Sequence, residues 1–130
     1  MVPPKNELIP ATPQNKQRAL DWIEANVFPS ESSNPMAALH KAISFEPDVI
    51  FLLSDNITGE RTYEIDRAAL LTMLDDANPV RGAAGERLTR IMCIQFLHLD
   101  PLNTLQEIAE IHGGPGAYKF LDAAELESRQ

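Results

Sequence analysis

Asp55 is the residue of this chain whose sequence context best suits a ligand-binding role. It closely follows the apolar run from Val49 to Leu53, whose length predicts a strand buried on both faces. In an open α/β sheet, ligands are bound at the carboxyl ends of the strands. The polar neighbours Ser54 and Asn56 are expected to form a ligand loop with Asp55. A structural alternative stays open, because an aspartate after a strand often caps the following turn with its own side chain.

Other reactive residue types form no recognisable catalytic or metal-binding pattern. The three histidines show no ligand spacing such as a helical i, i+4 pair, although His98 is expected near the same sheet end as Asp55. Cys93 lies within an apolar run and is expected to be a buried structural thiol. The run from Gly113 to Gly116 follows a predicted helix, whereas a phosphate-binding loop precedes one. It therefore predicts a helix stop and a turn.

Alternating helices and strands must position Asp55. Apolar runs predict strands at 48–54, 88–97 and 117–121, and apolar periodicity predicts helices at 13–26, 35–46, 63–77 and 101–112. This order predicts parallel strands joined by right-handed crossovers. The expected fold class is therefore α/β, with a short parallel sheet of about three strands flanked by helices, a partial doubly wound, Rossmann-like arrangement.

Three of the predicted helices begin with the same device, a capping residue followed by proline. The pairs are Thr12-Pro13, Asn34-Pro35 and Asp100-Pro101. A polar side chain at the N-cap accepts a free backbone N–H, and proline at the first helical position loses no helical bond. With these boundaries, residues 1–11 are predicted to be an extended leader, 12–121 the domain, and 122–130 an acidic tail.

Composition limits the class of partner. The chain has 130 residues and a formal net charge of −8, so it suits a single domain and disfavours nucleic acid or an anionic membrane as partner. The start of the sequence has no apolar core typical of a signal peptide, and no apolar run is long enough for a membrane helix. The expected compartment, chosen by elimination, is the cytoplasm.

The chain resembles the C-terminal part of a von Willebrand factor A (VWA) domain, particularly bacterial forms, over roughly residues 8–121. The pieces that carry the resemblance are A-T-P-Q-N-K-Q-R-A-L-D-W-I, S-S-N-P-M-A-A-L-H-K-A-I, P-D-V-I-F-L-L-S-D-N, I-M-C-I-Q-F and L-Q-E-I-A-E-I-H-G-G. Their order and spacing are more specific than any single piece. The resemblance implies a doubly wound α/β module that binds proteins through a metal-ion-dependent adhesion site.

The resemblance also implies which residues remain of that site. Asp55 matches the family's aspartate after a central strand, and Ser33 occupies the position of its threonine. Asn34, which follows Ser33 at a helix start, is expected to be a ligand-loop residue together with Ser54 and Asn56. The family's D-x-S-x-S loop has no counterpart here, and Asn56 replaces the usual glycine. Since Mg²⁺ requires near-octahedral oxygen coordination, Ser33 and Asp55 are expected to form an incomplete site with weak Mg²⁺ binding at most.

The function implied by the resemblance is a non-enzymatic protein-interaction module with an incomplete or degenerate adhesion site. Two alternatives stay open. The chain could be a small Mg²⁺-dependent hydrolase that uses Asp55, with Asp100 as its second carboxylate, or a truncated structural remnant without binding activity. The strand at 48–54 is expected to lack a neighbour on one side and to expose an apolar edge. The expected partners are therefore another protein, a second copy of the chain, or a complementing N-terminal fragment.

Overall fold

A computed structural model describes residues 7–29, 34–58 and 64–129. The chain divides into two compact units, 1–32 and 33–130. Helix α1 belongs to the first unit, and all other elements belong to the second. In chain order the elements are α1 (Pro13–Asn26), α2 (Pro35–Ile43), β1 (Val49–Ser54), α3 (Arg67–Ala77), β2 (Arg90–Phe96), α4 (Thr104–His112), β3 (Tyr118–Leu121) and α5 (Ala123–Glu127).

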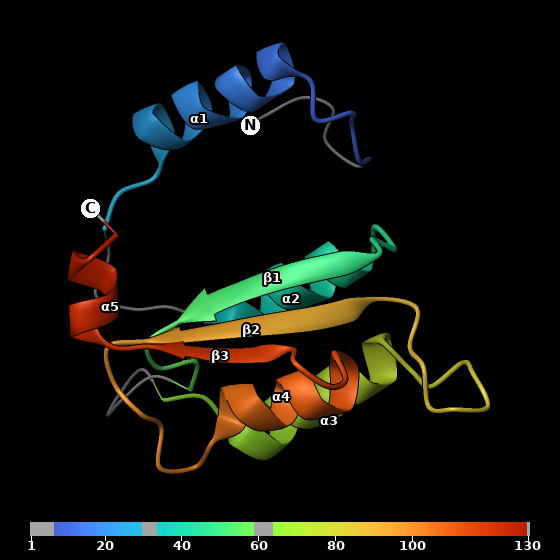
Figure 1. The fold of residues 1–130 in the computed structure, drawn as a ribbon. Helices are drawn as coiled ribbons and strands as arrows, with labels where there is room; N and C mark the ends of the chain where they lie inside the picture. The colour runs from blue at the N-terminus through green and yellow to red at the C-terminus, as the bar shows by residue number, and fades with distance from the viewer. Residues whose placement is uncertain (1–6, 30–33, 59–63, 130) are drawn as a thin grey trace. The chain divides into compact units, whose positions relative to one another are not determined.

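The second unit is built on an open, parallel, three-stranded sheet in the order β1-β2-β3 (Figure 1). The β1–β2 register runs from Val49 opposite Arg90 to Ser54 opposite Gln95, without interruption. Strand β3 pairs with the second half of β2. This sheet and its flanking helices confirm the α/β class and the parallel topology predicted from the sequence.

One face of this sheet packs against helices and forms the core. Ile91 and Cys93 of β2 are fully buried on this inner face. Helices α2, α3 and α4 supply most of the other core side chains. The buried apolar residues are Leu39, Ile43, Ile57, Leu70, Leu74, Ile91, Cys93, Leu105, Ile108, Ala109 and Ala117.

The other face of β1 is exposed, so the predicted burial of this strand on both faces is wrong. Val49, Phe51 and Leu53 expose 38%, 66% and 59% of their surface, while Ile50 and Leu52 between them are half-buried. Side chains alternate between the two faces along a strand. A continuous apolar run therefore predicted two covered faces, whereas the described residues 34–58 and 64–129 bury the inner face more than the outer one.

Two of the three predicted cap-and-proline starts are confirmed. The Thr12 hydroxyl accepts the N–H of Asn15 at 3.2 Å, and the Asn34 side chain accepts the N–H of Met36 at 3.0 Å. Helices α1 and α2 begin at the prolines that follow these caps. Local polar chemistry alone is sufficient to predict both starts.

The third predicted start is wrong, because α4 begins at Thr104 rather than after Asp100. The Asp100 carboxylate accepts the N–H groups of Leu102 and Thr104, each at 2.9 Å, and holds residues 100–103 in a turn. Asn103 has a positive φ of 52°, which interrupts any helical run through this segment. Asp100 thus caps the helix from four residues away.

Helix α3 also begins later than predicted. It starts at Arg67 rather than at residue 63, which lies outside the described residues. The Asp66 carboxylate caps it by accepting the N–H groups of Ala68 and Ala69. None of the described helices combines the length and the apolar character that crossing a bilayer requires.

Gly113 at the end of α4 is required by close packing rather than by its φ. A Cβ at this position would lie 2.3 Å from the backbone oxygen of Ile91 and 2.4 Å from the Cβ of Ala117. The next residue, Gly114, takes the left-handed conformation with φ +79°. The predicted helix stop in this glycine-rich run is therefore confirmed, with two glycines in two different roles.

Candidate functional site

The predicted site lies at the carboxyl end of β1. Asp55 directly follows the last strand residue and is exposed. Its carboxylate accepts the N–H of Asn56 at 2.8 Å, which is the kind of local turn bond expected from the structural alternative. Because the side chain is exposed, this bond does not prevent the carboxylate from meeting a ligand.

Asn56 anchors the loop that leaves the strand. Its side-chain oxygen accepts the hydroxyl of Thr58 at 3.2 Å, and the Thr58 carbonyl accepts the N–H of Ile65 at 2.8 Å. Within the described residues, the non-glycine positions with positive φ are Glu46, Leu97 and Asn103, so Asn56 does not use the left-handed conformation. Asn56 therefore does not adopt the positive φ that a glycine at this position would make accessible.

The remaining predicted site residues contribute in different ways. Ser54 ends β1, is half-buried and lies opposite Gln95 in the register. Asn34 uses its side-chain oxygen to cap α2. Ser33, the second predicted metal ligand, lies outside the described residues. Among the residues that the structure describes, no three His, Cys, Asp or Glu side chains gather closely enough to hold a metal ion.

Asp100, the second carboxylate of the hydrolase alternative, is engaged by its own segment. Both of its oxygens accept backbone N–H groups. Burial raises the pKa of the Asp100 carboxyl, but the bonds from Thr104 and Leu102 and the positive charge of Arg67 together hold that pKa below its usual range. Asp100 is thus an ionised structural cap, and the described residues show no catalytic pair formed with Asp55.

Gln95 is the residue at this end of the sheet that the sequence pattern did not single out. It is 1% exposed, and its amide nitrogen donates to the backbone oxygen of His98 at 2.7 Å and to that of Asp55 at 3.4 Å. Its side-chain oxygen accepts the hydroxyl of Tyr118 at 3.2 Å. Gln95 therefore connects the carboxyl ends of β1 and β2 with Tyr118, the first residue of β3, and positions the backbone of Asp55.

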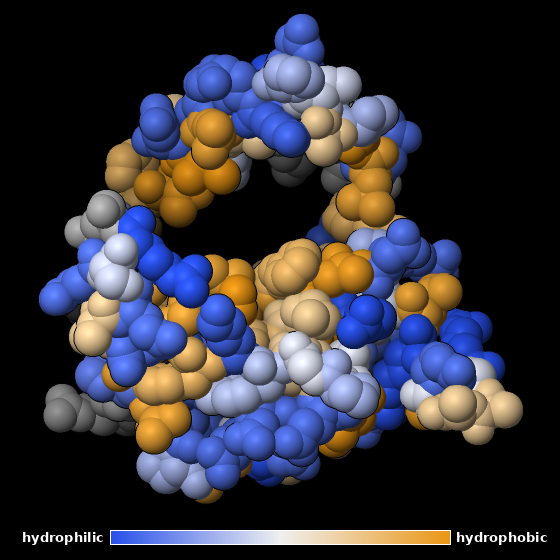
Figure 2. Space-filling view, viewed as in Figure 1, coloured by the Kyte–Doolittle hydropathy of each residue, from blue (hydrophilic) through white to orange (hydrophobic). Residues whose placement is uncertain are grey.

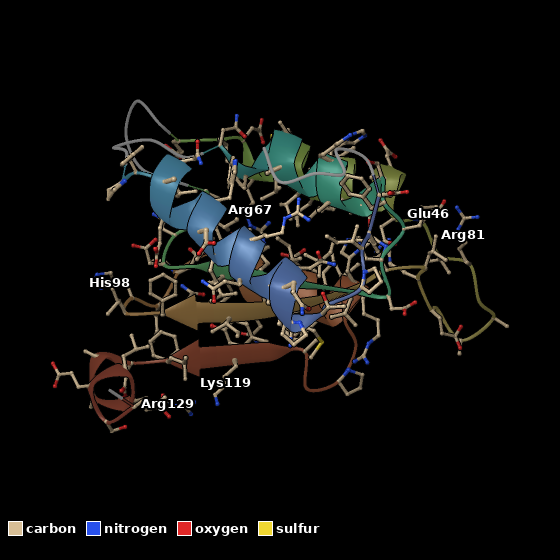
Figure 3. The ribbon with its side chains drawn as sticks, turned by 90° about the horizontal axis from the view of Figure 1, so that it is seen from above. Glu46, Arg67, Arg81, His98, Lys119 and Arg129 are labelled. Atoms are coloured by element: carbon tan, nitrogen blue, oxygen red, sulfur yellow. The ribbon has the colours of Figure 1, made fainter. Side chains whose placement is uncertain are left out.

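A signal for Gln95 is present in the sequence. It is a single polar residue inside the apolar run I-M-C-I-Q-F, and a buried amide of this kind requires hydrogen-bond partners. His98, by contrast, is exposed and lies past the end of β2 (Figure 3). Within the described residues, it contributes a backbone carbonyl to this loop rather than its imidazole.

A second polar cluster lies at the opposite end of the sheet, around the start of β2. His112 is 4% exposed and meets the amide nitrogen of Asn78 at 3.2 Å. That same amide donates to the Thr89 carbonyl at 2.7 Å. Arg87 donates to the Asn78 carbonyl at 2.7 Å and lies 3.0 Å from the carboxylate of Asp75. The segment after α3 is therefore anchored at Asn78.

The charges of this cluster favour a neutral His112. Burial lowers the pKa of the imidazole to about 4, and the positive charge of Arg87 acts in the same direction, while Asp75 at 3.5 Å partly opposes both. A cavity of about 430 Å³ beside the cluster is lined by both cationic and acidic side chains, including Arg90 and Glu110. This mixture selects no single ligand chemistry.

Cys93 has the structural role predicted for it. It is fully buried on the inner face of β2, and burial raises the pKa of its thiol to about 12. A thiol of that pKa is protonated at neutral pH and is a poor nucleophile.

Comparisons of the chain with protein-family models, with curated proteins and with solved structures found no match. The functional assignment of the chain therefore depends on the residues described above.

Proposed function

We propose that the chain is a non-enzymatic protein-interaction module of VWA-like architecture with an incomplete cation site at Asp55 and Ser33. The observation that supports this proposal most directly is the apolar outer face of the sheet. An uncovered face on a parallel sheet is unusual, because such sheets normally have helices on both sides. Extended exposed apolar surface is typical of protein-binding sites.

The register identifies the residues of this outer face. Residues opposite one another in adjacent strands share a face, so the exposed odd-numbered residues of β1 define it across the sheet. Its apolar members range from half-buried to two-thirds exposed. The surface over β1 is largely hydrophobic (Figure 2). The apolar residues of the outer face are Val49, Phe51, Leu53, Met92, Ile94, Phe96 and Leu121.

The charges on this face indicate the chemistry of the partner. Its charged members are Arg90 and Lys119, both cationic, although the whole chain carries a net charge of −8. The Arg90 guanidinium donates to the Gly113 carbonyl at the sheet margin, and Lys119 is exposed on β3 (Figure 3). A complementary partner surface is apolar with acidic residues at its rim.

The cation part of the proposal depends on Asp55. The described residues provide one exposed carboxylate there, which is too few oxygens for Mg²⁺ without further ligands from Ser33, water or the partner. The hydrolase alternative has less support, because Asp100 is bound to its own backbone segment. We therefore favour a binding role for this end of the sheet.

Affinity capture with matched variants tests the proposed binding face. Phe51→Glu places a charge on the face, and Leu99→Glu is the control, since Leu99 is 69% exposed and Phe51 66%. Proteins retained by the wild type and by Leu99→Glu, but lost with Phe51→Glu, should bind directly when purified. Equal retention by both variants would exclude the outer face as the binding surface.

Calorimetry tests the cation site separately. Mg²⁺ and Mn²⁺ are titrated into the wild type, Asp55→Asn and the control Asp48→Asn, which removes the same charge from an exposed position before β1. Weak heat that disappears with Asp55→Asn alone would support a partial site. Equal heat in all three proteins, or none, would remove the cation from the proposal and leave the protein-binding face to be judged by capture.

A further inference from the structure

Strand β1 forms one edge of the sheet, and its outward backbone groups are well defined. The N–H of Arg90 donates to the Asp48 carbonyl at 2.9 Å. This bond determines which alternate residues of β1 direct their backbone groups toward β2. Even-numbered residues of β1 therefore direct their N–H and C=O groups toward β2. Val49, Phe51 and Leu53 direct theirs away from β2, to the edge of the sheet.

The residues of β1 include none of the charges, prolines or bulges that usually protect an edge strand from pairing. The strand has six residues without charge or proline, and its register with β2 is uninterrupted by a bulge. Edge strands are normally kept short, charged, kinked or covered. The opposite edge, β3, is only four residues long and carries Lys119. The unprotected edge is thus specific to β1.

We propose that two copies of the chain pair through β1 in an antiparallel arrangement with the two-fold axis at Phe51. The three outward-facing residues then form three hydrogen-bonded pairs, Phe51 with Phe51 of the second copy and Val49 with Leu53 in both directions. The side chains of each pair lie on the same face. These three hydrogen-bonded pairs are therefore all apolar, including one aromatic pair at the axis.

Electrostatics favours this edge over the outer face as the site of self-association. Packing two outer faces together would bring the Arg90 and Lys119 side chains of both copies into one layer about 10 Å thick. Edge pairing instead separates the two β2 strands by three strand spacings, about 14 Å, which exceeds the Debye length of about 8 Å at physiological salt. The cations therefore do not oppose the edge dimer.

The strength of the dimer follows from its size. A six-residue strand gives an edge about 20 Å long, which buries less than the roughly 800 Å² per partner of a standard interface. The expected dissociation constant is consequently micromolar or weaker, on the order of 1–100 μM. This inference does not depend on the proposed partner protein, because it concerns the purified chain alone.

Charged substitutions of Phe51, studied separately and as a mixture, test the antiparallel β1 pairing. Phe51→Lys or Phe51→Glu places like charges directly opposite each other, and each variant alone should raise the dimer dissociation constant at least about tenfold in sedimentation. Mixing the two variants should restore dimers, because opposite charges then meet. Ile94→Lys and Ile94→Glu, on the same face but one strand inward, are the matched controls and should dimerise alone without needing to be mixed.

A second measurement does not require any variant to fold. Amide hydrogen exchange of the wild type should slow at Val49, Phe51 and Leu53 as protein concentration rises from about 1 to about 500 μM, across the expected dissociation constant. A wild-type chain that stays monomeric across this range would overturn the proposal. So would dimers that persist in each separate Phe51 variant.

Discussion

Acidification should destabilise the fold through His112. The pKa of this imidazole is lowered from 6.5 to about 4 by burial and by the charge of Arg87, against the opposing effect of Asp75. The folded protein therefore binds the proton less readily than the unfolded chain does. The stability contribution of neutral His112 is complete above pH 6.5 and is lost as the pH falls from there toward 4.

The size of the effect follows from the pKa difference. Each pKa unit corresponds to about 1.4 kcal/mol, so the full loss below pH 4 is about 3 kcal/mol and the loss between pH 7 and 5 is about 2 kcal/mol. Asp100 does not interfere in this window. Its pKa lies below 3.8 in the folded state, so its contribution is lost only at lower pH.

Urea unfolding at pH 7, 6 and 5 measures this loss directly. His112→Gln is expected to be less stable at neutral pH, because Asn78 loses its ring partner, but its stability should vary less with pH by about 2 kcal/mol. The pH slope, rather than absolute stability, is therefore the quantity to compare. His40→Gln removes an exposed histidine and is the matched control. If the free energy of unfolding of His112→Gln varied with pH as much as that of the wild type, the assignment of this loss to His112 would be refuted.

Five substitutions test the packing of the sheet by denaturant unfolding. Ile91→Ala should cost about 2–5 kcal/mol because Ile91 is fully buried, whereas Phe51→Ala on the outer face should cost less than about 1 kcal/mol; equal costs would contradict the assignment of the faces. Gln95→Leu should cost about 1–3 kcal/mol because the Tyr118 hydroxyl loses its acceptor and the backbone carbonyls of Asp55 and His98 lose their buried amide donor, and Tyr118→Phe should cost less. Gly113→Ala should cost about 1–3 kcal/mol through overpacking, and a neutral result would contradict the close approach at this position.

Sequence patterns predicted the elements whose determinants are local. Thr12 and Asn34 act on backbone groups two or three residues away, so the helix starts that they specify are readable from the chain alone. Asp100-Pro101 shows the same pattern, yet the carboxylate accepts the more distant N–H of Thr104 and Asn103 turns left-handed. The same pattern of a capping residue followed by proline thus has two outcomes. A helix begins at the proline in α1 and α2, whereas a turn precedes the helix in α4.

Burial and long-range polar contacts could not be predicted in the same way. The run in β1 is apolar on both faces, and periodicity carries no information about how many helical layers will cover it. Gln95 and Asn78 each join segments separated by more than ten residues in the chain. Their roles depend on which strand ends and helix ends become neighbours, and this is decided by the fold rather than by local sequence.

The outer face and the open edge have a common physical origin in the thin sheet. Among the strands that the structure describes, β2 is the one paired on both sides, whereas β1 has a strand on one side only and exposes apolar side chains. Strand pairing with a second copy provides hydrogen-bond partners for the outward backbone groups of β1 but does not cover the outer face. A partner surface with acidic residues covers the outer face but does not pair with these backbone groups. Two different contacts are therefore needed to cover β1.

If the chain dimerises through Phe51, the two outer faces join into a continuous six-stranded surface, and partner binding should become tighter at concentrations where dimers form. Affinity measured above and below the dimer dissociation constant would show whether the two contacts are coupled, and identical affinities would show that they act independently.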